Sequence, residues 1–202
     1  MDADTHADAP FQSWILALRE RLSSPPPQRL PASDLRAASV LVPLYVEAGE
    51  LWTVLTTRTD TLPNHRSQIA FPGGARELGE DAWAAALRES HEEVGLDPKR
   101  VLRLGELDEG ETPTGFRVIP CVGAVPYPLQ MQPNAAEIAE VFSLPLSAFS
   151  NPQLVEDRPI VVNGVEHELR IYHVGRRQIW GLTARILQNL LIRLGLESAD
   201  EN

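Results

Sequence analysis

The hydrophobic positions at the start of the chain recur at helical spacing. Residues 10–22 place apolar side chains three or four positions apart, at Phe11, Trp14, Ile15, Leu18 and Leu22. This pattern predicts an amphipathic helix with Pro10 in its first turn. Residues 23–27 read Ser-Ser-Pro-Pro-Pro and cannot continue the helix, because proline lacks a backbone N–H and favours extended geometry. We therefore expect residues 1–30 to be a helix and linker that dock on the rest of the domain or on a partner, and residues 31–202 to form the main domain.

Several later segments have the alternating or continuous apolar pattern of β-strands. Residues 36–58 predict a hairpin with its turn at Gly49-Glu50, and residues 59–68 form a polar loop before a short apolar strand at residues 69–72. Residues 101–115 combine strand character with an acidic loop, and residues 116–127 predict another strand with proline boundaries. Two alternating runs around Asn163-Gly164 predict a second hairpin.

Two further helices are predicted downstream. Residues 81–94 place Trp83, Ala86, Leu87, Ser90 and Val94 on one face, and Gly95 ends the helix. A helix from about Leu182 ends at Gly195, and a short helical turn opens at Pro145. Because strands and helices do not alternate strictly, the order of elements favours an α+β fold, a sandwich around a mixed sheet, over a doubly wound fold.

Composition and charge limit the possible partners. The chain has 202 residues, a length typical of one domain, and a formal net charge of −10, which argues against a nucleic-acid or anionic membrane surface. Cys121 is the single cysteine, so no intramolecular disulfide can form, and its apolar surroundings indicate a buried thiol. The acidic N-terminus lacks the order of a secretory signal, and no apolar run is long enough to span a bilayer. We expect a cytoplasmic protein.

Three carboxylates gather on the helix predicted for residues 81–94. Glu89, Glu92 and Glu93 lie three and four positions apart and therefore share one face. Like charges at this spacing destabilise an isolated helix, by roughly 0.2–0.5 kcal/mol per pair. A divalent metal with oxygen ligands would relieve that repulsion, whereas the alternative is an acidic face exposed to solvent.

The stretch from Gly74 to Leu96 resembles the Nudix box, G-x5-E-x7-R-E-U-x-E-E-x-G-U, in which U is a bulky apolar residue. The matching positions are Gly74, Glu80, Arg88, Glu89, Glu92, Glu93, Gly95 and Leu96, and Ser90 stands where an aliphatic residue is expected. A hydroxyl at that position can bond back to the helix backbone. The resemblance implies a Nudix-like α/β/α sandwich and metal-dependent hydrolysis of a nucleoside diphosphate linked to another group.

The resemblance also implies roles for individual residues. Glu89, Glu92 and Glu93 correspond to ligands of Mg2+ or Mn2+, a backbone carbonyl of Gly73 or Gly74 completes the shell, and Glu80 and Arg88 form a supporting structural pair. We expect the catalytic carboxylates to be Glu92, Glu93 and Glu140. Within the box Glu92 is the first choice for the general base; Glu137 or Glu140 could supply the base instead, and the sequence does not rank them.

A second resemblance narrows the substrate. Residues 54–74 are similar to the motif that precedes the box in coenzyme A pyrophosphatases, with agreement at Leu55, Thr56, Arg58, Phe71, Pro72, Gly73 and Gly74 and departures at Val54, Thr59, Pro63 and Ser67. His65, Gln68, Ala70 and residues 179–187 are also similar to that subfamily. This implies hydrolysis of coenzyme A or acyl-coenzyme A. We expect Arg58, Arg66 and Gln68 to contact the substrate, since a guanidinium suits bidentate binding of phosphate, and we expect a monomer or homodimer. The alternatives are a Nudix hydrolase of ADP-ribose or a nucleotide sugar, and an inactive Nudix-like ligand sensor.

Overall fold

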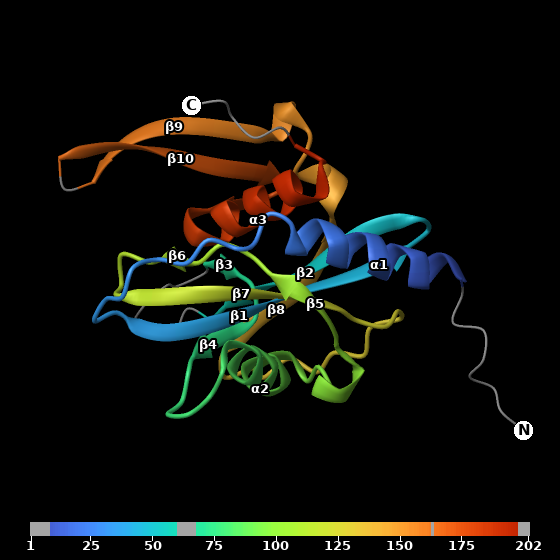
Figure 1. The fold of residues 1–202 in the computed structure, drawn as a ribbon. Helices are drawn as coiled ribbons and strands as arrows, with labels where there is room; N and C mark the ends of the chain where they lie inside the picture. The colour runs from blue at the N-terminus through green and yellow to red at the C-terminus, as the bar shows by residue number, and fades with distance from the viewer. Residues whose placement is uncertain (1–8, 60–67, 163, 198–202) are drawn as a thin grey trace, which may run out of the picture.

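Figure 1 shows a mixed β-sheet covered by helices on both faces. The computed structural model describes residues 9–59, 68–162 and 164–197. The helices are α1 (Ala9–Ser23), α2 (Ala82–Val94) and α3 (Gly181–Leu194), and short 3-10 turns are η1 (Pro98–Arg100), η2 (Leu146–Ala148) and η3 (Pro152–Leu154). The strands are β1 (Arg36–Glu47), β2 (Glu50–Arg58), β3 (Ile69–Ala70), β4 (Gly73–Ala75), β5 (Leu102–Glu106), β6 (Gly110–Glu111), β7 (Phe116–Ala124), β8 (Ile138–Pro145), β9 (Val155–Val162), β10 (Val165–Val174) and β11 (Arg177–Trp180).

The main sheet is mixed, as the sequence predicted. Its strand order is β3-β2-β1-β7-β5, with β4 paired to β1, β6 to β7 and β8 to β2. Strands β1 and β7 run parallel, and the other described pairs are antiparallel. A second sheet has the order β11-β10-β9, and its strands β9 and β10 lie above α3 in Figure 1. The predicted α/β/α sandwich around a mixed sheet is therefore confirmed.

Helix α1 docks on the domain itself. Ile15, Leu18 and Leu22 are buried in the hydrophobic core that α3 forms with one face of the sheet. Two arginines connect α3 to α1 and to the linker after it, because Arg21 Nη1 donates to Leu194 O (2.5 Å) and Arg193 Nη1 donates to Pro25 O (2.6 Å). The helix predicted before the proline-rich linker thus forms and shares the domain core.

Helix α2 covers the opposite face of the sheet through the predicted apolar stripe. Trp83, Ala86 and Val94 are buried against Leu41 and Val54 of the sheet. Ser90 is fully buried in the same stripe, and its Oγ donates to Ala86 O at 2.6 Å, as its position predicted. The hydroxyl that replaces the expected aliphatic side chain is therefore satisfied within the helix.

Both predicted hairpins form. The turn between β1 and β2 lies at Ala48 and Gly49 (φ 51° and 81°), one residue earlier than predicted, and both residues adopt the left-handed conformation that suits a two-residue hairpin turn. The pairing of Val162 with Val165 closes the β9–β10 hairpin, while Asn163 lies outside the described residues.

Strands β4, β8 and β11 were not predicted. Strand β4 reads as a Pro-Gly-Gly interruption, yet it pairs with β1 so closely that a Cβ on Gly73 would lie 2.5 Å from Val40 Cα. Only glycine permits this approach. Within the described residues, none of the helices combines the length and apolar character needed to cross a membrane.

Candidate active site

Helix α2 is held at both ends, which fixes the direction of its glutamates. At the N-terminus the Asp81 side chain accepts a hydrogen bond from Ala84 N (2.7 Å). At the C-terminus Gly95 adopts the left-handed conformation (φ 71°), and its N–H donates to His91 O (2.9 Å). Each contact satisfies a backbone or capping group that would otherwise favour fraying of the helix end.

Glu93 is the buried carboxylate of the site. Only 2 % of the residue is exposed; Oε2 accepts from the backbone N–H of Gly73 (3.0 Å), and Oε1 accepts from Arg58 Nη1 (3.2 Å). Burial raises the pKa of Glu93 to about 7, against the opposing effects of the Gly73 N–H and the Arg58 charge. The site therefore contains an acid that a further cation would keep ionised near neutral pH.

Glu89 lies against the glycine pair of β4. A Cβ on Gly74 would approach the Glu89 carboxylate carbon to 2.6 Å, so the absence of a side chain at this position makes room for the carboxylate. The charge of Glu89 also contributes to the raised pKa of Glu93, which shows that the two carboxylates interact. The two residues thus converge from α2 on Gly73 and Gly74.

Arg88 and Glu80 form the pair that the sequence indicated. Arg88 donates from Nε and Nη2 to the two oxygens of Glu80 (2.8 and 3.0 Å), and Nη2 also reaches Ala75 O (3.1 Å). This bidentate contact lowers the pKa of Glu80 to about 2. Arg88 Nη1 then donates to Glu89 Oε1 (2.9 Å), so the pair connects the loop before α2, strand β4 and one proposed ligand.

Glu92 is the most accessible of the three glutamates. Its side chain is 55 % exposed and lies 3.4 Å from Arg88 Nη1. Among the described residues, no three His, Cys, Asp or Glu side chains already form a group that could hold a metal ion. The oxygen donors of Glu89, Glu92 and Glu93 nevertheless suit Mg2+ or Mn2+, and the raised pKa of buried Glu93 is the unfavourable effect that a cation would relieve. Binding would require Glu92 and Glu93 to exchange arginine contacts for the metal, whereas Arg88 can keep its contact with Glu89 Oε1.

The two candidate carboxylates near β8 occupy different positions. The charge of Glu137 contributes to the raised pKa of Glu93, and Glu137 Oε1 accepts from Asn134 Nδ2 (3.2 Å). Glu140 instead pairs in register with Thr57 and accepts from Arg177 Nη2 (2.6 Å). The structure therefore does not bring Glu140 to the glutamates of α2. The sequence pattern did not indicate a role for Arg177, although two consecutive arginines precede residues 179–187, the segment similar to the coenzyme A pyrophosphatases.

The remaining predicted contacts lie close to Arg58 along the chain. Gln68 accepts at its backbone oxygen from Arg58 N (3.2 Å), which joins the two ends of the polar loop. Arg66 lies outside the described residues. Of the three proposed substrate contacts, the structure thus places Arg58 at the glutamate cluster and Gln68 beside the backbone of Arg58.

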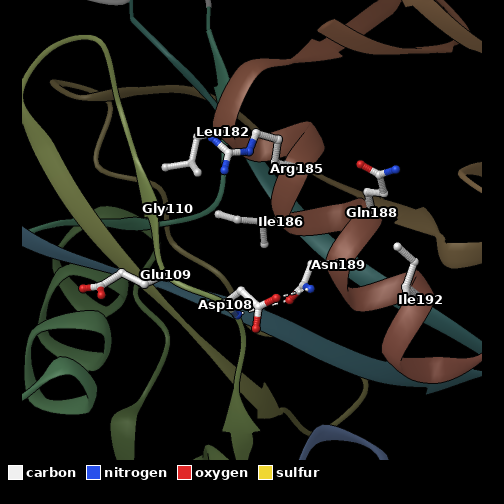
Figure 2. A pocket seen from close by; sticks show the side chains of 9 residues that line it. All are labelled: Asp108, Glu109, Gly110, Leu182, Arg185, Ile186, Gln188, Asn189 and Ile192. Atoms are coloured by element: carbon white, nitrogen blue, oxygen red, sulfur yellow. Dashed lines mark hydrogen bonds between the residues drawn. The ribbon is translucent and has the colours of Figure 1, made fainter. Parts of the chain in front are cut away.

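A hollow of about 350 Å³ lies on the other side of the sheet, between Asp108 and helix α3 (Figure 2). Asp108 points toward Asn189, whose Nδ2 donates to Oδ2 (2.8 Å), and Asp108 also accepts from Arg193 (2.5 Å). These contacts tie the β5–β6 connection to α3. We interpret this hollow as part of the packing of α3, because both of its acidic residues, Asp108 and Glu109, already accept hydrogen bonds.

Comparisons with known proteins match the chain to one family. The family description "NUDIX domain" matches residues 35–162. The chain is 35 % identical over 173 residues to "Uncharacterized Nudix hydrolase NudL" of Photorhabdus laumondii, which covers 85 % of this chain and 92 % of that protein. A protein of the same description from Cronobacter sakazakii is 37 % identical over 161 residues, covering 79 % and 83 %.

A solved structure supports the fold over nearly the whole chain. It is the MutT/nudix family protein from Enterococcus faecalis, with a TM-score of 0.56 and 18 % sequence identity. The match covers 96 % of this chain and 71 % of that one. The likeness therefore includes elements outside the family match at residues 35–162, and it concerns the fold alone.

Proposed function

The chain belongs to the NUDIX domain family of hydrolases, and we propose that it hydrolyses the pyrophosphate bond of coenzyme A and its derivatives. The products would be 3′,5′-ADP and 4′-phosphopantetheine or its acylated form. The observation that carries this proposal is the contact of Arg58 with Glu93. It joins the segment similar to coenzyme A pyrophosphatases to a glutamate of the Nudix box.

Oxygen ligands define the proposed metal site. Glu89, Glu92, Glu93 and the backbone carbonyl of Gly73 would hold Mg2+ or Mn2+. The metal would supply neutralisation of phosphoryl charge and a bound water of lowered pKa. Arg88 holds Glu89 in position through its contacts with Glu80 and Ala75 O, which is the structural role proposed for the Glu80–Arg88 pair.

The protein would then position the substrate and accept a proton. Arg58 is partly exposed, with 29 % of its side chain accessible, so its guanidinium can exchange Glu93 for a phosphate oxygen. Arg66 and Gln68 are the other proposed contacts. Glu92 remains the first choice for the general base because it is the accessible carboxylate of the box, and Glu93 would take part as a buried carboxylate that a cation keeps ionised.

The proposed setting is cytoplasmic, with the protein acting as a monomer or homodimer. The single thiol supports a reducing compartment: Cys121 is buried, and burial raises its pKa well above the ordinary value. A buried neutral thiol is unreactive and stays reduced without a partner cysteine, which is consistent with a reducing compartment.

Product analysis tests the proposal. Purified protein with Mg2+ or Mn2+ is incubated separately with coenzyme A, an acyl-coenzyme A, ADP-ribose and a nucleotide sugar, and the products are identified by mass. We expect release of 3′,5′-ADP from the first two and a higher kcat/KM for them. Hydrolysis of ADP-ribose or the sugar nucleotide with no 3′,5′-ADP from coenzyme A would reassign the substrate, and turnover of none of them would favour a ligand sensor.

A double variant tests the metal site. Glu89→Gln with Glu93→Gln should lower kcat by roughly a hundredfold or more while the circular dichroism spectrum stays folded, because it removes two proposed ligand charges. The matched control is Glu20→Gln with Glu111→Gln, two exposed carboxylates away from the cluster. Equal turnover in the two double variants would contradict the metal assignment.

A further inference from the structure

A second cavity lies where β2, β8 and β11 meet. Its volume is about 370 Å³, and its lining includes Thr57, Glu140, Arg176, Arg177 and Trp180. We call it the arginine–tryptophan pocket. Neither the box nor the upstream motif assigns a role to Arg176 or Arg177.

Positive charge exceeds negative charge in this pocket. Arg177 Nη2 donates to Glu140 Oε1 (2.6 Å), and Arg176 Nη2 lies 3.8 Å from the same oxygen, so two guanidinium groups share one carboxylate. The Arg177 guanidinium also lies over the Phe142 ring at 4.0 Å, and its buried Nε has no hydrogen-bond partner among the described residues. In a chain of net charge −10, this arrangement suits a second anion beside Glu140.

Trp180 adds an aromatic surface at the same place. The residue is 48 % exposed and lines the pocket as the N-cap of α3, where it provides no side-chain hydrogen bond to the first turn. The uncapped backbone N–H groups of that turn add positive potential. An exposed indole face suits stacking with a planar base, so the pocket combines contacts for a phosphate and for an aromatic ring.

The pocket and the cluster of Glu89, Glu92 and Glu93 both lie near the end of β2. Thr57 lines the pocket, whereas the next residue, Arg58, contacts Glu93. Successive side chains of a strand point to opposite faces, so one ligand that used both places would pass around the end of β2. A substrate with a phosphomonoester on its ribose, several bonds from its pyrophosphate, has one anionic group for each place.

We propose that the arginine–tryptophan pocket binds the phosphomonoester and base of the nucleotide half of the substrate. Arg176 and Arg177 contact the phosphate on the ribose, and Trp180 stacks on the base. This inference rests on the proposed function, because that phosphate is present in coenzyme A and absent from dephospho-coenzyme A. Glu140 then positions the two arginines.

Paired substrates test the phosphate contact. The wild-type protein should prefer coenzyme A over dephospho-coenzyme A in kcat/KM, and Arg176→Gln and Arg177→Gln should each reduce that ratio roughly tenfold, the usual effect of losing one charge-assisted hydrogen bond. Arg158→Gln on β9 is the matched control, because Arg158 is exposed and pairs with Glu156, two residues away on the same strand. Since Arg176 is 83 % exposed, its replacement should leave the fold intact. An equal loss for both substrates would overturn the inference.

Direct binding separates this inference from the proposed function. Without metal, 3′,5′-ADP should bind more tightly than 5′-AMP and quench tryptophan fluorescence; Trp180→Phe should remove the quenching, and Arg176→Gln should remove the preference. Inorganic phosphate is the third ligand, and phosphate binding as tight as that of 3′,5′-ADP would overturn the role of the base. Binding as expected with no hydrolysis of coenzyme A would refute the proposed function alone. Hydrolysis with equal binding of 3′,5′-ADP and 5′-AMP would refute the pocket alone.

Discussion

Gly73 donates its backbone N–H to Glu93 Oε2 across 3.0 Å, so the carboxylate of a helix residue is held at the backbone of an edge segment of the sheet. The same carboxylate accepts from Arg58, and burial nevertheless dominates its titration. Strand β4, strand β2 and helix α2 are therefore joined through one ionisable group.

Stability of the metal-free protein should fall as the pH rises through about 7. The folded protein raises the pKa of Glu93 from 4.5 to about 7, so between these values it retains a proton that the unfolded chain releases. The stabilising contribution is complete below about pH 4.5 and is lost above about pH 7, and it is on the order of 3 kcal/mol. Urea unfolding with a chelator at about pH 5 and about pH 8 measures it. Glu93→Gln should flatten this dependence, and a slope equal to that of the wild type would assign it to another group.

Gly74→Ala should weaken metal binding and turnover. The added Cβ would lie 2.6 Å from the Glu89 carboxylate carbon and displace that side chain. We expect metal affinity to fall roughly 10- to 100-fold, as when the support of a metal ligand is lost. Metal titration of turnover measures the change. Glu89→Asp in the Gly74→Ala background should recover part of the loss, because the shorter side chain can withdraw, and strictly additive losses would contradict steric displacement.

Glu137→Gln should lower kcat more than Glu140→Gln does. Glu137 interacts electrostatically with Glu93, whereas Glu140 is engaged by Arg177 in the other pocket. Loss of a general base costs roughly 100-fold or more, so the pH profile of kcat for the two variants and for Glu92→Gln identifies the base. A larger fall in kcat for Glu140→Gln, with KM unchanged, would contradict this prediction and support a catalytic role for Glu140.

Ser90 tests the packing of α2. Ser90→Ala should change stability by less than about 1 kcal/mol, since its hydroxyl bonds only to Ala86 O within the helix. Ser90→Leu should cost about 1–3 kcal/mol, because the site is fully buried and already packed. Urea unfolding compares these variants with Ala84→Leu, an exposed position of the same helix. A Ser90→Leu protein as stable as Ala84→Leu would indicate unfilled space beneath α2.

Local patterns predicted the elements whose form is decided locally. The apolar stripe and Gly95 define α2, and alternating strands around a tight turn define each hairpin. The pattern could not reveal strand β4 or strand β8, because both form by pairing with strands far away in sequence. The periodicity of one segment carries no information about which distant strand will pair with it.

The candidate site shows the same division. The spacing of Glu89, Glu92 and Glu93 predicted one acidic patch, yet only packing against β4 buries Glu93 and leaves Glu92 accessible. Glu140 was expected to join them as a catalytic carboxylate. Its position instead follows from register, because Glu140 pairs with Thr57, and the next residue of β2, Arg58, points to the opposite face and contacts Glu93.

The contacts of Arg21 with Leu194 and of Arg193 with Pro25 couple the local unfolding of α1 to that of α3. Fraying of α1 would uncover α3, and loss of the last turn of α3 would release Arg21. We therefore expect the two helices to open together. The rate of proteolytic cleavage in either helix should then follow the free energy of that joint opening. Deleting residues 1–30 would remove the contacts of α1 with α3 and expose to solvent the core leucines that α1 covers.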